Sequence, residues 1–483
     1  MSRGLFIYNK WIHEAGPELG STDPVTGQVV WKGCTARPQE IDAAVAAARV
    51  AAADWAKQEL SQRREIIERF AGLLEEHSGA MALAISREVG KPDWEAATEV
   101  RSMIGKVELS IEAHERRCAS FVGGTAVARF RPHGVVAVLG PFNFPGHLPN
   151  GHIVPALLAG NTVVFKPSEQ APLVAEETVA LWEKAGLPAG VLNLVQGGGD
   201  VGAHLVEHPG VDGVFFTGSA RAGVAINTRL AGTPQKILAL EMGGNNPLIV
   251  HRVVDREAAV LLTLQSAFLS AGQRCTCARR LIVERAEAGD AFLEALVTGA
   301  ARIRVGHHTE RPEPFMGPVI SPVAAEAVLK AQAGWVARGG RSLLESRRLR
   351  AGSGLLSPGI IDVTEMVERE DGEVFGPLLQ VIRVDTFDAA IEEANRTVFG
   401  LAAGLISDDR EAYEVFRRRI RAGLINWNQQ LTGASGAVPF GGVGLSGNHR
   451  PCGFFAADYC SYPVASIEIP EVRRPATLPP GLE

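Results

Sequence analysis

Short apolar runs alternate with longer amphipathic segments along most of this chain. The run at 134–141 is continuously apolar and ends in Gly-Pro, which is typical of a strand buried on both faces of a parallel sheet. Comparable runs at 161–167, 191–195 and 211–217 are separated by segments with helical periodicity. This alternation predicts βαβ units and an α/β fold built on a doubly wound sheet.

The other segments have different patterns. Residues 5–32 predict short strands joined by turns, and residues 38–117 have the periodicity of long amphipathic helices, whose charged residues we assign to solvated faces. A second alternating region, with longer helices, extends from 236 to 428. The segments 121–132 and 454–469 are extended, and the second could pair with the first or with another subunit.

Composition narrows the function classes. Of 483 residues, 46% are hydrophobic and 21% charged, the balance of a folded chain with more than one domain. The net charge of −6 and the pI near 6.1 provide no basic surface for nucleic acid. No apolar run is long enough to span a bilayer, and Met1–Lys10 lacks the apolar core of a signal peptide. Six dispersed cysteines fit a reducing compartment, so we expect a cytoplasmic protein without nucleic-acid or membrane partners.

The stretch 271–280 contains the strongest candidate nucleophile. Cys275 follows a glycine-broken segment, and positive charge on Arg274, Arg279 and Arg280 could lower the thiol pKa and favour the thiolate. The neighbouring Cys277 is expected to pack in the interior or to act as a resting-state thiol. A buried and unreactive Cys275 is the alternative that this stretch alone leaves open.

Two further polar groups follow predicted strands. Glu241 precedes Gly243 and Gly244, where backbone can approach a ligand and a buried carboxylate can act as a general base. A turn with a solvated glutamate is the alternative. Asn143 lies in a loop fixed by two prolines, which would orient its amide to stabilise an oxyanion; a simple proline-rich turn would have the same sequence.

Two segments could hold a nucleotide. Lys166, Ser168 and Glu169 follow a strand, where the lysine could donate to a ribose diol and the glutamate could accept from it. A carboxylate here would repel a 2′-phosphate, which favours NAD over NADP. The second segment opens a helix and offers free N–H groups to a pyrophosphate; it consists of Gly218, Ser219, Ala220, Arg221, Ala222 and Gly223. No G-x-G-x-x-G fingerprint follows the first strand of the sheet, so this pattern alone does not define a standard Rossmann site.

These motifs occur in a specific order along the chain: Asn143, Lys166 with Glu169, Gly218 with Ser219, Glu241 with Gly243 and Gly244, then Gln273 with Cys275. Later segments at 373–377, 426–428 and 439–447 agree with them. In this order the chain resembles the NAD(P)-dependent aldehyde dehydrogenase superfamily over nearly its whole length. The resemblance implies an α/β fold with a Rossmann-type NAD-binding domain, an α/β catalytic domain and a β oligomerisation arm.

The resemblance also implies roles and bounds. Cys275 would be the nucleophile, Glu241 the general base, and Asn143 the oxyanion donor beside the Cys275 N–H. Lys166 and Glu169 would hold the adenosine ribose, 218–223 would face the pyrophosphate, and Glu373 and Phe375 would hold the nicotinamide ribose. The implied domains are a NAD-binding domain (1–120 and 134–240), a catalytic domain (241–453), and an arm with a tail (121–133 and 454–483). The arm implies a homodimer or a homotetramer.

Longer strings narrow the substrate class. The segments 146–155, 241–247, 274–280 and 446–451 resemble a subfamily that oxidises a semialdehyde of arginine breakdown, whose carboxylates lie far from the aldehyde. The cations expected to bind those carboxylates, each of which could instead form a structural ion pair, are Arg101, Arg274, His449 and Arg450. Another acidic semialdehyde, such as succinic or glutamate semialdehyde, and a catalytically silent relative are the alternatives.

Three histidines raise the question of a metal. His133, His147 and His152 have no cysteine or carboxylate at the spacing of a closed ligand set. Core or loop positions explain them, so we expect no metal.

Overall fold

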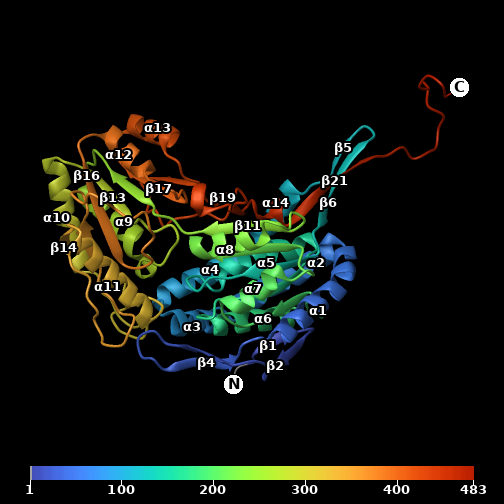
Figure 1. Cartoon of the computed structure of the whole chain (residues 1–483), viewed down its shortest axis with the longest axis horizontal. Coiled ribbons are helices and arrows are strands. Elements are labelled where there is room, and N and C mark those ends of the chain that lie inside the picture. The colour runs from blue at the N-terminus through green and yellow to red at the C-terminus, as the bar shows by residue number, and fades with distance from the viewer. Residues whose placement is uncertain (1–2, 483) are drawn as a thin grey trace.

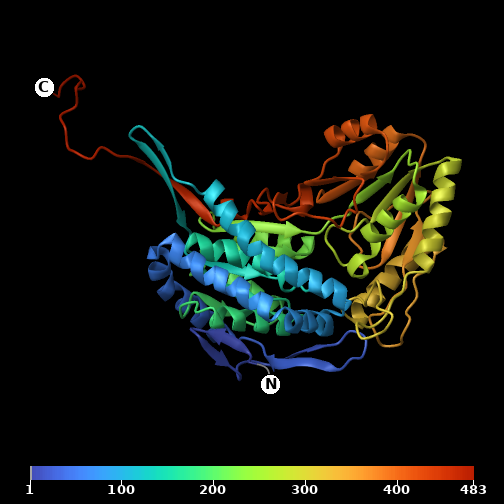
Figure 2. The ribbon, with the colours of Figure 1, turned by 180° about the vertical axis from the view of Figure 1, so that it is seen from behind.

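The protein forms two lobes, each built around a seven-stranded sheet, and a β-arm that projects from one lobe (Figures 1 and 2). The structure is a computed structural model and describes residues 3–482. Residues 1, 2 and 483, which fall within the predicted domains, lie outside the described part.

The first sheet has its five parallel strands at the centre and one edge. Its strands, in spatial order, are β11 (Ile237–Met242), β10 (Gly213–Gly218), β7 (Val135–Leu139), β8 (Thr162–Lys166), β9 (Leu192–Leu194), β1 (Leu5–Ile7) and β2 (Lys10–Ile12). Strands β1 and β2 add antiparallel to the edge at β9. All five residues of β7 are buried, as its unbroken apolar pattern predicted.

Two cores cover the two faces of this sheet. Alternate residues of β7 point to opposite faces, so that Val136 and Val138 join one core while Val135 and Ala137 join the other. The helices of the first core are α2 (Leu60–Glu76), α3 (Ser78–Val89), α4 (Asp93–Arg117), α5 (His147–Ala159) and α6 (Pro172–Lys184). Those of the second are α1 (Pro38–Lys57), α7 (Gly199–Glu207) and α8 (Ala220–Leu230). The helices predicted over 38–117 are present as four consecutive helices, but they do not form one layer, because α1 covers one face of the sheet and α2, α3 and α4 cover the other.

The second lobe has its own sheet and core. Its strands, in spatial order, are β14 (Arg341–Leu344), β15 (Gly359–Asp362), β16 (Leu378–Val384), β13 (Arg280–Glu284), β12 (Pro247–Val250), β17 (Ala402–Ile406) and β18 (Leu424–Trp427). All neighbours are parallel except β14 with β15. The helices are α9 (Arg256–Phe268), α10 (Glu287–Ala301), α11 (Pro322–Ala337), α12 (Phe387–Asn395) and α13 (Arg410–Arg419). The chain crosses between the sheets after β11, a few residues later than the alternating pattern predicted.

The arm joins two segments that are far apart in sequence. Its strands are β5 (Phe121–Gly123), β6 (Ala126–Pro132) and β21 (Ser461–Ile467), and β21 pairs with β6 in the register Ser461↔Pro132. The returning strand expected near the C-terminus therefore pairs within its own chain. The smaller elements are β3 (Glu18–Thr22), β4 (Val29–Cys34), η1 (Leu269–Gly272), β19 (Pro439–Phe440), η2 (Gly444–Ser446), β20 (Cys452–Gly453) and α14 (Ala456–Tyr459). In residues 3–482 no helix is both long and apolar enough to cross a bilayer.

Candidate active site

Cys275 lies in the loop that joins α9 to β13 of the second sheet. The loop starts at η1, where Gly272 has a φ of 70°. A Cβ on Gly272 would lie 2.1 Å from the carbonyl oxygen of Gly376, so a glycine is required where these two backbones approach. This approach places the loop of Cys275 against the loop at 373–377.

A buried amide that the sequence interpretation missed holds the cysteine loop. Asn246 Nδ2 donates to the carbonyl oxygens of Cys275 (2.7 Å) and Cys277 (2.9 Å), while its Oδ1 accepts from the Ala402 N–H (3.1 Å). Only 1% of Asn246 is exposed. The only signal in the sequence was its place, two residues after the Gly243-Gly244 pair, which marks tight backbone but not the partner of the side chain.

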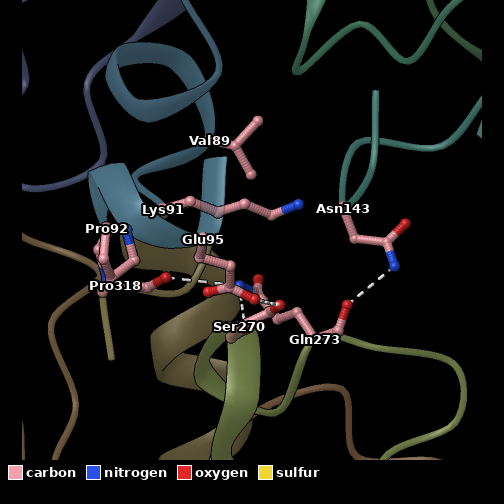
Figure 3. Close-up of a pocket in the computed structure, with 9 residues that line it drawn as sticks. Val89, Lys91, Pro92, Glu95, Asn143, Ser270, Gln273 and Pro318 are labelled. Carbon is pink, nitrogen blue, oxygen red and sulfur yellow. Dashed lines mark hydrogen bonds between the residues drawn. The ribbon is translucent and has the colours of Figure 1, made fainter. Parts of the chain in front are cut away.

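Two hydrogen-bond donors lie beside Cys275. Asn143, in the loop after β7, donates from Nδ2 to the carbonyl oxygen of Gln273 at 2.8 Å, as Figure 3 shows. Within residues 3–482, the backbone N–H of Cys275 has no hydrogen-bond partner. The structure thus brings the amide of the first lobe to the cysteine loop of the second, as an oxyanion site requires.

Glu241 comes from the first sheet but faces the same place. It lies near the end of β11, in register with Thr217 of β10, and is 4% exposed. Its Oε1 has no hydrogen-bond partner in the part of the chain that the structure describes, and burial raises the pKa of its carboxyl well above the usual range. After burial, the charge of Glu241 is the next cause of the raised pKa of Cys275, so the carboxyl lies within electrostatic range of the thiol.

The expectation that three arginines would lower the thiol pKa is wrong. Burial, followed by the charges of Glu241 and Glu373, raises the pKa of Cys275 far above its usual range, and only Arg279 acts in the opposite direction. The other two arginines bind elsewhere. Arg274 Nη2 lies 2.6 Å from a Glu95 carboxylate oxygen, and Arg280 donates to backbone carbonyls of the second lobe. The thiol is therefore protonated in the unliganded protein at neutral pH.

Glu373 and Phe375 lie on the other side of the site. Glu373 Oε1 lies 3.1 Å from Arg279 Nη2, and a Cβ on Gly243 would come within 1.9 Å of Glu373 Oε2. Burial raises the pKa of Glu373, while Arg279 lowers it. Phe375 packs edge-on against Phe142 with ring centroids 5.9 Å apart, which joins the loops of the two lobes.

The predicted nucleotide residues meet at one edge of the first sheet. Lys166 Nζ, at the end of β8, donates to the carbonyls of Pro167 and Gly197 and lies 3.9 Å from Glu169 Oε2. Burial lowers the pKa of Lys166 to about 8, although Glu169 raises it. Glu169 is half exposed, and Ser168 Oγ accepts from the Gln170 N–H. The Lys166 ammonium and the Glu169 carboxylate are thus adjacent at the carboxyl edge.

The segment 218–223 begins α8 at that same edge. Ser219 caps the helix by accepting from the Ala222 N–H, and a Cβ on Gly223 would lie 2.1 Å from Met242 Sδ. Glycine therefore lets α8 pack directly on the sheet, with its N-terminus beside the end of β10.

The sheet continues to β8 and β9 on one side of β7 and to β10 and β11 on the other, so β7 marks the point where strand order reverses. Ligands of open α/β sheets bind at such a point.

The comparisons with known proteins decide the family. The sequence model of the aldehyde dehydrogenase family matches residues 11–462. The chain belongs to the aldehyde dehydrogenase family. It is 56% identical, over 99% of both chains, to N-succinylglutamate 5-semialdehyde dehydrogenase of Ectopseudomonas mendocina (strain ymp). The predicted family and subfamily resemblance is confirmed.

Solved structures agree with that family. A cysteine-to-alanine mutant of aldehyde dehydrogenase C from Pseudomonas syringae, bound to NAD+ and octanal, is 30% identical over 96% of both chains with a TM-score of 0.91. The γ-glutamyl-γ-aminobutyraldehyde dehydrogenase of Burkholderia cenocepacia J2315 is also 30% identical over 96% of both chains, with a TM-score of 0.90. The predicted α/β aldehyde dehydrogenase fold is confirmed, and the chain is an oxidoreductase of this family.

The cations proposed for substrate carboxylates do not gather in this aldehyde dehydrogenase. Arg101 is exposed on α4 and donates to Thr98, and Arg274 is already paired with Glu95. His449 and Arg450 line a separate cavity of about 290 Å³ at the base of the arm. The structure therefore places none of the four as an unpaired cation beside Cys275.

Two of the three histidines considered as metal ligands, His152 and His133, have ordinary hydrogen-bond partners. His152 is held between the Tyr459 hydroxyl (2.8 Å) and the Thr217 hydroxyl (2.9 Å), and burial lowers its pKa to about 3. His133 Nε2 lies 3.1 Å from the Tyr459 carbonyl oxygen. One group of possible metal ligands occurs in the described part, where donor atoms of Asp23, His307 and His308 lie within 4.8 Å of one another. These side chains already bond to one another or to Asp93 and Thr309.

Proposed function

We propose that this aldehyde dehydrogenase oxidises N-succinyl-L-glutamate 5-semialdehyde to N-succinyl-L-glutamate with NAD as the hydride acceptor. The observation that carries the chemistry is the meeting of Cys275, Asn143 and Glu241 from two different sheets at one point. The identity of 56% to a curated enzyme with this substrate supports the choice among aldehydes. A catalytically silent relative is disfavoured because the thiol, the amide and the base are all present.

The first half-reaction forms a thioester. Ionised Glu241 accepts the thiol proton, and Cys275 Sγ attacks the aldehyde carbon to form a tetrahedral adduct. The Asn143 amide and the Cys275 N–H donate to the oxyanion that develops on the former aldehyde oxygen. NAD, when bound, supplies the acceptor for the hydride that leaves this carbon, and the thioester remains on Cys275.

The second half-reaction is hydrolysis. Glu241 is buried and its pKa is raised, so it is a stronger base than a free carboxylate when it is ionised. Glu241 first releases the thiol proton to solvent and then takes a proton from water, whose oxygen attacks the thioester carbon; Cys275 leaves as the thiolate and the acid is released. The open Oε1 of Glu241, which has no partner within the described residues, is the atom that can bind this water.

The residues fit a dinucleotide. Lys166, Ser168 and Glu169 would hold the adenosine ribose, 218–223 the pyrophosphate, and Glu373 with Phe375 the nicotinamide ribose. The close packing of Gly223 on Met242 leaves the N-terminus of α8 open at the carboxyl edge of the sheet. The half-exposed Glu169 carboxylate would repel a 2′-phosphate, which is the reason for proposing NAD over NADP.

The test compares substrates. Reduction of NAD by the purified protein is measured with N-succinylglutamate semialdehyde, succinic semialdehyde and glutamate semialdehyde. A kcat/KM that is highest for the succinylated substrate supports the proposal. A clear preference for either shorter aldehyde would keep the mechanism and replace the substrate.

We also propose that the enzyme is cytoplasmic and that its arm mediates a homodimer or a homotetramer. All six cysteines are free thiols, which fits a reducing compartment. The arm exposes Phe121, Val122 and Ile467, apolar side chains that a second subunit could cover. Sedimentation velocity, with and without removal of the arm hairpin at 121–132, tests the assembly.

A further inference from the structure

Five charged side chains lie together where α4 meets the loop of Asn143. Lys91 Nζ lies 2.6 Å from Glu99 Oε2, and Arg274 Nη2 lies 2.6 Å from Glu95 Oε1. Figure 3 shows Lys91 extending towards the Asn143 loop, with Glu95 beneath it. The fifth group is Lys106 of α4. We call these five residues the α4 charge cluster.

Lys106 differs from the other cations of the α4 charge cluster. It is 3% exposed, and its Nζ donates to one acceptor, the carbonyl oxygen of Gly453, at 2.9 Å. No carboxylate in residues 3–482 lies within ion-pair distance of it. Three cations and two carboxylates therefore leave the cluster with one uncompensated positive charge. A buried ammonium without a counter-ion is costly, and an anion bound beside it would offset that cost.

The surroundings of Lys106 are electrically positive. Burial, and then the charges of Lys106 and Lys91, lower the pKa of His147 to about 4. The imidazole is therefore neutral at pH 7 and does not change the net charge of the α4 charge cluster. His147 Nδ1 has no hydrogen-bond partner among the described residues. An anion bound beside Lys106 could therefore contact an ammonium that has no carboxylate partner among the described residues and the Nδ1 atom of His147.

Lys106 also lies close to the reacting groups. A Cβ on Gly151 would be 3.5 Å from Cys452 Sγ and 3.9 Å from Lys106 Cε, which are ordinary van der Waals distances, so the lysine and the thiol both lie beside this glycine of α5. Burial raises the pKa of Cys452, on which the charges of Lys106 and Glu241 also act in opposite directions, so both groups lie within electrostatic range of this thiol. On the other side, the ring of His147 lies edge-on to Phe144, the neighbour of Asn143 in sequence. Lys106 thus lies next to residues that adjoin the loop of Asn143 and the surroundings of Glu241.

We propose that Lys106 binds a carboxylate of the substrate that is remote from the aldehyde. This assignment rests on the proposed function, because it requires an acidic semialdehyde. Arg274 and Lys91 already have carboxylate partners, whereas Lys106 has none among residues 3–482, so the substrate would complete the α4 charge cluster as its third anion. The binding energy would act on an aldehyde that carries a remote carboxylate and would be absent for an uncharged one.

The test is the variant Lys106→Met, which keeps the length of the side chain and removes its charge. The kcat/KM is measured for N-succinylglutamate semialdehyde and for hexanal, and the ratio of the two is compared with wild type. Loss of a buried hydrogen bond to a charged group predicts that this ratio falls about 30-fold, chiefly through KM. The surface variant Lys330→Met removes the same charge from an exposed position on α11 and should leave the ratio unchanged.

A second measurement does not depend on turnover. The product N-succinylglutamate should raise the unfolding temperature of the wild type and of Lys330→Met, but should have little effect on Lys106→Met. Equal losses on both aldehydes, together with product protection like that of the wild type, would overturn the assignment. A wild-type enzyme without preference for the acidic aldehyde would overturn the proposed function itself, and this assignment with it.

Discussion

Replacing Asn246 by alanine should disable the enzyme without touching a reacting group. The carboxamide of Asn246 satisfies the carbonyls of Cys275 and Cys277 and the N–H of Ala402, at 2.7, 2.9 and 3.1 Å. The side chain is 1% exposed, so bulk water cannot easily take its place. The substitution leaves three backbone groups unpaired around the nucleophile.

The loss of stability can be calculated from these three unpaired backbone groups. Each buried polar group left without a partner costs about 1–3 kcal/mol, so the free energy of unfolding of the second lobe should fall by about 3–5 kcal/mol after partial relaxation. The cysteine loop also loses its anchor relative to Asn143. Because a misplacement of about 1 Å can cost on the order of 100-fold in rate, kcat should fall by about that factor.

Steady-state NADH production and urea unfolding measure the two effects. The matched control is Asn395→Ala, which removes two hydrogen bonds, to the Arg419 carbonyl and from the Arg421 N–H, far along the same lobe. It should cost about 1 kcal/mol per hydrogen bond and leave kcat unchanged. Asn246→Asp keeps the volume but turns both donors into acceptors, so it should be at least as damaging as alanine. Near-normal kcat in Asn246→Asp would refute the reasoning.

Three further outcomes are expected. Cys275→Ala should abolish aldehyde oxidation while NAD binding, followed by tryptophan fluorescence, stays near wild type; retained turnover would exclude Cys275 as the nucleophile. Glu241→Gln removes the base of both half-reactions, so the first turnover of NADH seen by rapid mixing and the steady rate should each fall on the order of 100-fold; a burst of NADH at the wild-type rate would show that Glu241 acts only in thioester hydrolysis. Because burial raises the pKa of Cys275, its thiol is protonated near neutral pH, and its alkylation by iodoacetamide should still accelerate above about pH 9; a plateau near neutrality would show that the thiolate is already formed.

Much of the fold could be read from neighbouring residues. The apolar run of β7 predicted a strand covered on both faces, and every residue of it is buried. The positions of the strand ends also predicted where polar groups would gather, because the carboxyl ends of parallel strands lie at one edge of a sheet. Lys166, at the end of β8, and Glu241, near the end of β11, bear this out.

The charges around Cys275 could not be read in this way. Arg274 is next to the cysteine in sequence, yet its carboxylate partner Glu95 comes from α4, 179 residues earlier. Arg280 turns to carbonyls of the second lobe instead. Sequence adjacency says which side chains start near one another, but the direction of each depends on the elements packed around it.

The sequence by itself determined the α/β class, the order of the elements and the residue types at the strand ends, because period and strand-end chemistry depend on residues adjacent in the chain. The tertiary structure alone decided that Glu241 belongs to the first sheet and Cys275 to the second, and that the two meet. It also decided that Lys106 is buried without a carboxylate partner within the described residues. Burial and ion pairing depend on partners brought together across hundreds of residues, and local periodicity carries no record of them.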